Sequence, residues 1–142
     1  MARILAIDLG QKRTGIATTD PLQIIATALD TVPTHTLLPF LKAYMAKEPT
    51  ETIVVGLPID TQGQPSALFA KAKALMATLA KLYPAVSILP HDERFTSVMA
   101  KQTILASGIG KMARRDKAMY DKVSATIILQ SYLEERSYKR PQ

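Results

Sequence analysis

The chain has 142 residues, 47% of them hydrophobic, which is the length of one ordinary domain with enough apolar side chains for a core. It contains no cysteine, and this excludes a disulfide framework, a thiolate zinc site and a cysteine nucleophile. Eighteen Lys and Arg residues outnumber twelve Asp and Glu, and the net charge of +6 favours polyanionic partners such as nucleic acids. No apolar run suits a signal peptide or a membrane span, so we expect one soluble, cytoplasmic domain over residues 1–142 with no membrane partner.

The first third of the chain is predicted to form three strands in an antiparallel meander. Apolar and β-branched residues fill 3–9, 16–20 and 23–32, and short polar turns separate these segments. Residues 3–9 are apolar on both strand faces, which is typical of a central strand covered by helices on both sides.

The rest of the chain alternates between helices and strands. Helices are predicted over 35–48, from Ser66 to about Tyr83, from about Thr96 to Ser107 and from about Lys117 to Glu135; strands are predicted over 52–58 and 86–90. This order predicts an α/β fold with a mixed central sheet flanked by helices. Its first three strands are antiparallel, and its later strands are parallel because helical crossovers connect them.

Asp8 is the first candidate functional residue. Counting by two places it on the same strand face as Ile4 and Ala6, where an ionised carboxylate is costly unless a cation or hydrogen-bond donors meet it. It also lies at the carboxyl end of a central strand, where open α/β sheets usually bind ligands. The alternative is a structural carboxylate that accepts hydrogen bonds from the turn amides of Gly10 to Lys12.

Asp121 is the second candidate. It shares a helix face with Ala125, Ile128 and Tyr132, so it lies at the N-terminal end of a stripe that faces the core. The helix dipole stabilises a carboxylate near that end, which is the structural alternative.

The triplet Asp92-Glu93-Arg94 directly follows the strand 86–90 and supplies the third candidate. Only one of its two acids can readily point inward. The guanidinium of Arg94 can bind a neighbouring carboxylate or a substrate phosphate. A solvated loop is the alternative.

Three acids in these places indicate a metal-dependent phosphodiesterase. Two divalent ions can activate a water and neutralise a leaving oxygen, and they need several oxygen ligands. Mg²⁺ prefers carboxylates, with Mn²⁺ as the other candidate cation. No HExxH, Walker A or GxSxG motif competes for the chemistry.

Basic residues flank these acids in the sequence. Lys12 and Arg13 follow Asp8, and a glycine-bearing loop immediately before Asp121 adds four cations, Lys111, Arg114, Arg115 and Lys117. Positive charge on both sides of a carboxylate cluster is typical of a phosphate track, although a cationic loop is often merely solvated.

Four segments in order give the chain a resemblance to the YqgF family. They are 8–17 (DLGQKRTGIA) followed by Asp20, 55–58 (VGLP), 92–96 (DERFT) and 121–133. The resemblance implies a ribonuclease H-like fold and a metal site of Asp8, Glu93 (in preference to Asp92) and Asp121. It also implies that Lys12, Arg13 and Arg94 lie near the substrate.

The same resemblance implies maturation of the 5′ end of pre-16S rRNA, in ribosome biogenesis. A Holliday-junction resolvase is the alternative; it acts on branched DNA and requires a homodimer, whereas the nuclease can be a monomer or a homodimer. A non-catalytic RNA-binding module is a third reading, which the aromatic content of 6% weakens. An actin-like kinase needs two domains closing over ATP, and this chain has length for only one.

Overall fold

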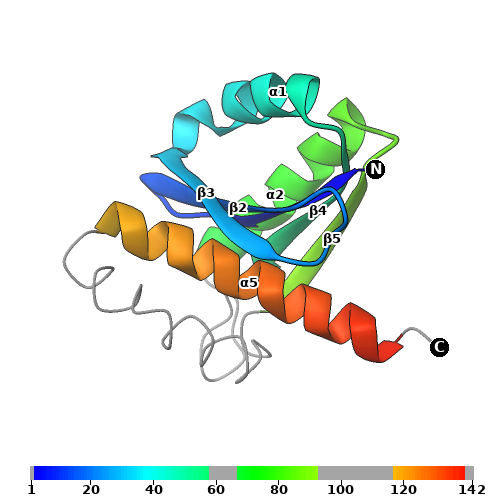
Figure 1. Cartoon of the computed structure of the whole chain (residues 1–142). Coiled ribbons are helices and arrows are strands. Elements are labelled where there is room, and N and C mark those ends of the chain that lie inside the picture. Colours follow the sequence, from blue (N-terminus) through cyan, green and yellow to red (C-terminus); the bar gives the residue numbers. More distant parts are fainter. Residues whose placement is uncertain (1, 58–66, 93–116, 140–142) are drawn as a thin grey trace.

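The computed structural model describes residues 2–57, 67–92 and 117–139, and five strands form a mixed sheet in the order β3-β2-β1-β4-β5 (Figure 1). The strands are β1 (Arg3–Asp8), β2 (Arg13–Thr19), β3 (Ala26–Pro33), β4 (Thr50–Leu57) and β5 (Ser87–Asp92). The pairs β1–β2 and β2–β3 are antiparallel, whereas β1–β4 and β4–β5 are parallel. The predicted α/β class and the predicted sheet are therefore confirmed.

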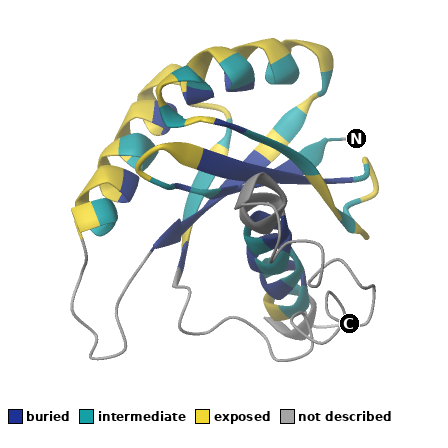
Figure 2. Ribbon diagram, turned by 90° about the vertical axis from the view of Figure 1, so that its left-hand side faces the viewer, coloured by how far each residue is buried: buried dark blue, intermediate teal, exposed yellow. Residues whose placement is uncertain are grey.

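Helices cover both faces of this sheet (Figures 1 and 2). One face carries α1 (Leu37–Lys47), preceded by the short 3-10 helix η1 (Thr34–Thr36), together with α2 (Ala67–Leu82). The other face carries α5 (Lys117–Lys139). The helix predicted over 96–107 lies outside the described residues. None of the described helices is long and apolar enough to span a membrane.

The central strand β1 contributes to two separate cores, as its sequence predicts. Leu5 and Ile7 pack in the core under α1 and α2, while Ile4 and Ala6 pack in the core under α5. All four side chains are fully buried. The alternation follows from the two-residue period of a strand, and it means that β1 cannot slip by one residue without exchanging the two cores.

Small side chains let α5 lie close to the middle of the sheet. Ala6 of β1, Ala17 of β2 and Ala125 of α5 are all 0% exposed and belong to one cluster. Ile128 completes the predicted apolar face of α5. Because alanine adds only a methyl group, the helix backbone can approach the strands and is held there by dense packing.

The loop between β2 and β3 corrects one prediction. Residues 23–25 were expected to begin the third strand, but β3 begins at Ala26. The carboxylate of Asp20 accepts hydrogen bonds from the amides of Leu22 (3.2 Å), Ile24 and Ile25 (both 2.8 Å), and this side chain closes a loop. Gln23 has a φ of 62°, which a strand cannot contain. Local side-chain hydrogen bonds thus override the strand propensity of two isoleucines.

Asp20 makes this loop sensitive to acid. The amide of Ile25, opposed in part by desolvation and helped by the amides of Ile24 and Leu22, lowers the pKa of Asp20 from its ordinary value of 3.8. A carboxyl with a lowered pKa in the folded state stabilises the fold above its unfolded pKa, and this contribution is lost as the pH falls through the folded pKa.

We expect Asp20→Ala to speed hydrogen exchange at the amides of Leu22, Ile24 and Ile25 at pH 7 and to lower the urea midpoint. The difference from the unmodified protein should shrink as the pH falls below 3.8. Asp20→Asn retains an oxygen that can accept hydrogen bonds and is the matched control. Equal exchange in the Ala variant and the unmodified protein would contradict this assignment.

Two other element boundaries differ from the predictions for clear reasons. The turn expected at residues 11–14 is shorter, because Arg13 and Thr14 already pair with Pro33 and Val32 of β3. The helix predicted over 35–48 begins at Leu37, after η1. Pro39 is therefore the third residue of α1, within the first turn, where its missing N–H breaks no helical hydrogen bond.

Candidate active site at the carboxyl edge of the sheet

The parallel strands β1, β4 and β5 all end at one edge of the sheet, called here the carboxyl edge. Asp8 is the last residue of β1, and Asp92 is the last residue of β5. The turn between β1 and β2 lies at the same edge, because β2 runs antiparallel to β1. Ligands of open α/β sheets usually bind outside this edge, so the topology gives Asp8 a functional position.

A row of residues crosses the sheet at the level of Asp8. Gly15 of β2 pairs directly with Asp8, and Thr31 of β3 pairs with Gly15. On the other side, Ile7 pairs with Val55, so the next residue of β4, Gly56, is level with Asp8, and Gly56 pairs with His91 of β5. Paired residues share a face, and Ile4 and Ala6 place Asp8 on the face of α5.

Glycines therefore flank Asp8 on both neighbouring strands. Neither Gly15 nor Gly56 contributes a side chain to the space beside the half-buried Asp8 carboxylate. Glycines on both sides leave room beside this carboxylate, at the end of a buried strand, for a hydrated cation or a phosphate oxygen. From the sequence alone, Gly15 and Gly56 could be interpreted only as glycines of a turn and of a strand end. Their position beside Asp8 follows from the strand register.

The direction of α5 brings its first turns toward the same edge. Near its other end, the guanidinium of Arg136 donates to the side-chain oxygen (2.8 Å) and the main-chain oxygen (3.3 Å) of Gln23. The side-chain nitrogen of Gln23 in turn donates to the carbonyl of Ala2, just before β1, at 2.8 Å. Thus α5 ends where β1 begins, and the two elements run in opposite directions (Figure 1).

The lengths of the two elements agree with this arrangement. From Arg136 back to Asp121 the helix rises about 22 Å, and from Ala2 to Asp8 the strand rises about 20 Å. The backbone of Asp121 therefore lies toward the carboxyl edge, as does Asp8. The side chain of Asp121 is outside the described residues.

The third predicted acid, Glu93, also lies outside the described residues. It follows directly on β5, whose His91 is 4% exposed and points toward α5. Nδ1 of His91 is 4.0 Å from Oε2 of Glu135. Because Glu135 is about 21 Å along the helix from Asp121, β5 ends beside the later turns of α5 rather than its first turn. The backbone of Asp121 thus lies toward the same edge as Asp8, whereas Glu93 is outside the described residues.

Two of the predicted basic residues lie at the carboxyl edge with exposed side chains. Lys12 is in the turn between β1 and β2, and Arg13 is the first residue of β2. The carbonyl of Lys12 accepts a hydrogen bond from the amide of Thr34 at 2.9 Å, and the hydroxyl of Thr34 donates to the carbonyl of Gly10 at 2.8 Å. These bonds fix the basic turn beside Asp8.

The side chains of the other predicted basic residues are outside what the structure describes. Lys117 is the first residue of α5, and its side chain is not described. Four further residues lie outside the described residues: Arg94, Lys111, Arg114 and Arg115.

The donor set fits a hard divalent cation at Asp8. The described side chains form no cluster of three potential metal ligands. Asp8 itself is a carboxylate at a glycine-flanked strand end, and Mg²⁺ needs only one or two protein carboxylates because it retains several waters.

Gly10 is required for the shape of the basic turn. A Cβ built on Gly10 would overlap the carbonyl oxygen of Arg13, which is part of the backbone and cannot move aside easily. We expect Gly10→Ala to lower the free energy of unfolding by about 1–3 kcal/mol, as measured by urea titration, and to reduce any activity that depends on Asp8. Gln11→Ala, at an exposed position of the same turn, should change little and serves as the control.

Comparison with solved structures defines the class of protein. The fold is similar to that of Thermus thermophilus RuvC in complex with a Holliday junction substrate, with a TM-score of 0.59, 16% sequence identity and coverage of 96% of each chain. A second Thermus thermophilus RuvC structure gives a TM-score of 0.53 at 15% identity and the same coverage. The chain thus has the ribonuclease H-like fold, as predicted.

Sequence comparison then identifies the family. Residues 2–135 match the family model RuvX, described as Holliday junction resolvase. The chain is 56% identical over 134 residues to a Porphyromonas gingivalis protein named "Putative pre-16S rRNA nuclease", covering 94% of this chain and 97% of the relative. It is 49% identical over 138 residues to a Flavobacterium johnsoniae protein of the same name, covering 97% and 100%. The chain belongs to the RuvX family, which confirms the resemblance stated above.

Proposed function

We propose that this protein is a metal-dependent nuclease that hydrolyses phosphodiester bonds in the precursor of 16S rRNA, as one nuclease domain. The observation that carries the proposal is Asp8: a half-buried carboxylate at the end of the central strand, between two glycines, on the face covered by α5. The names of the relatives from Porphyromonas gingivalis and Flavobacterium johnsoniae support the substrate.

In this proposal Asp8, Glu93 and Asp121 hold one or two divalent cations, Mg²⁺ or Mn²⁺. A bound cation pair supplies an activated water and neutralises charge on the leaving oxygen. The assignment of Glu93 rests on the family motif, because Glu93 lies outside the described residues.

The chain's own residues then position the substrate. Lys12 and Arg13 lie at the carboxyl edge beside Asp8 and can bind the phosphates that flank the scissile bond. Asp8 is half buried at the end of a sheet strand, which limits the positions that its carboxylate can take and preorganises it for a ligand. In this proposal five further basic residues of the sequence also bind substrate phosphates: Arg94, Lys111, Arg114, Arg115 and Lys117.

A Holliday-junction resolvase is the second candidate, favoured by the description of the family model. It would use the same carboxylates but requires two active sites related by a two-fold axis. A homodimer at low concentration would favour the resolvase, whereas a monomer would count heavily against it.

The test is a direct comparison of substrates. Purified protein is incubated with a 5′-extended pre-16S rRNA fragment and with a four-way DNA junction, in Mg²⁺, in Mn²⁺ and in a chelator. We expect cleavage of the RNA that requires the divalent cation and is absent in Asp8→Asn. Binding of the RNA without cleavage in any cation would instead indicate a non-catalytic RNA-binding module.

A further inference from the structure

The layer formed by α1 and α2 carries charge of one sign. Within Leu37–Lys47 and Ala67–Leu82 there are five lysines and no acidic residue, a charge of +5. All five side chains are exposed: Lys42, Lys47, Lys71, Lys73 and Lys81. This layer covers the face of the sheet opposite α5, so it is separate from the face on which Asp8 lies (Figure 2).

This concentration of charge has no compensating partner on the two helices. The nearest acid in sequence, Glu48, follows α1 and pairs with Arg3 at 3.1 Å. Lys73 lies over the ring of Phe69, 6.0 Å from its centroid, which stabilises one ammonium locally. Like charges on neighbouring helices repel one another, and a polyanion that neutralises them also releases its condensed counterions.

The side chains between the lysines on the exposed face of α2 are mostly short. The exposed positions include five alanines: Ala67, Ala70, Ala74, Ala77 and Ala80. These short side chains let a ligand backbone approach the ammonium groups along most of the helix, and the exposed Leu82 lies at its end, beside the groove described next.

The lysines continue the basic turn at the carboxyl edge. The hydrogen bonds from Thr34 tie the start of the η1–α1 segment to the turn that contains Lys12. α2 follows β4 in the chain and ends just before β5, so it also begins toward the carboxyl edge and runs about 24 Å toward the opposite edge. Lys71 and Lys73 therefore lie nearer the candidate active site, and Lys47 and Lys81 lie at the far edge.

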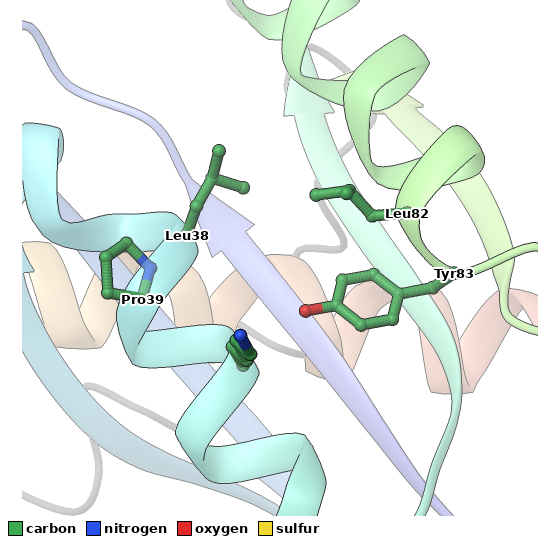
Figure 3. Close-up of a pocket in the computed structure, with 5 residues that line it drawn as sticks. Leu38, Pro39, Leu82 and Tyr83 are labelled. Carbon is green, nitrogen blue, oxygen red and sulfur yellow. The ribbon is translucent and has the colours of Figure 1, made fainter.

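An apolar groove lies between α1 and the end of α2 (Figure 3). It has a volume of about 520 Å³ and is lined by Leu38, Pro39, Lys42, Leu82 and Tyr83. The Tyr83 ring extends across the groove toward α1 (Figure 3). An aromatic ring with aliphatic neighbours can hold an unpaired base while an adjacent ammonium binds its phosphate, a combination typical of single-strand binding sites.

We propose that the α1/α2 layer is a second binding surface, which holds a single-stranded extension of the nucleic acid substrate after it has crossed the carboxyl edge. The proposal rests on the proposed nuclease function for its ligand. The five lysines bind phosphates without reading sequence, and the groove holds an unstacked base. The layer lies on the face of the sheet opposite Asp8 and takes no part in the hydrolysis.

The test measures binding of a fluorescent oligouridylate of about 30 nucleotides to the full chain carrying Asp8→Asn, so that cleavage cannot interfere. On that background, the α2 variant combines Lys71→Gln, Lys73→Gln and Lys81→Gln. If three contacts are lost, the slope of log K against log salt concentration should become less steep by about 2, and affinity should fall about tenfold or more. The matched control carries Arg at the same three positions and should bind like the parent.

Independent variants keep the proposal open to refutation. Lys42→Gln with Lys47→Gln tests α1 alone, and Tyr83→Leu removes the ring while retaining an apolar side chain for the core. Unchanged affinity and unchanged salt slope in both lysine variants would overturn the proposal. Equal competition by poly-L-glutamate at the same charge concentration, with no effect of Tyr83→Leu, would also overturn it, in favour of an acidic protein partner. Because the binding assay needs no cleavage, failure of the nuclease proposal is a separate result.

Discussion

Asp8→Asn should abolish cleavage while leaving the fold intact. The substitution keeps the shape of the side chain but removes the charge that holds a divalent cation, and we expect a loss on the order of 10³-fold or more in kcat/KM, equivalent to about 4 kcal/mol of transition-state stabilisation. The urea midpoint should not fall, because a half-buried carboxylate is replaced by a neutral group of the same size. The rate is measured on the RNA fragment at saturating Mg²⁺.

The control for this prediction is Asp30→Asn in β3, which removes a carboxylate that accepts a hydrogen bond from the adjacent amide of Thr31 at 2.8 Å. Its activity should stay within a few-fold of the unmodified protein. If Asp8→Asn retained full activity, Asp8 would be a turn-capping residue and the nuclease proposal would lose its central observation.

Asp121→Asn should lower kcat/KM nearly as much as Asp8→Asn does. In the double variant the two losses of activity should not be additive. Both carboxylates are proposed to hold the same cations, so removal of one already disables the site. We expect the double variant to be no more than a few-fold worse than either single variant. The same comparison of single and double variants, with Glu93→Gln in place of Asp121→Asn, tests the third proposed ligand. Mn²⁺ titrations report whether the affinity for the cation falls in each variant.

Additive losses in this comparison would mean that the two acids act independently. Full activity of Asp121→Asn would remove α5 from the metal site and leave it a structural helix whose dipole stabilises Asp121. The Ala125 contact would still explain why this helix lies against β1.

Much of the fold could be predicted from the sequence because each element carries its own pattern. The doubly apolar segment around Ile4 to Ile7 marks the central strand, and the spacing of Ala125 and Ile128 marks the buried face of α5. The start of β3 was missed because a single carboxylate, Asp20, organises the preceding loop through hydrogen bonds. Hydrophobic periodicity contains no information about such bonds.

The candidate site was predictable only in part. Asp8 stood out as an acid at the end of an apolar strand, but the roles of Gly15 and Gly56 depend on strand register. Register is set by pairing between distant segments, and no local pattern reports it. The position of Asp121 likewise depends on the clamp between Arg136 and Gln23, which are 113 residues apart in sequence.

The close seating of α5 on alanines has a consequence for synthesis of the protein. All five described strands precede α5 in the chain, so a nascent polypeptide can assemble this sheet while Ile4, Ala6 and Val54 still expose an uncovered apolar surface. Only packing of α5 against the sheet buries this surface and brings the backbone of Asp121 toward the carboxyl edge, where Asp8 lies. With Asp121 as a proposed metal ligand, a newly made molecule would become active only in the late step that completes its folding.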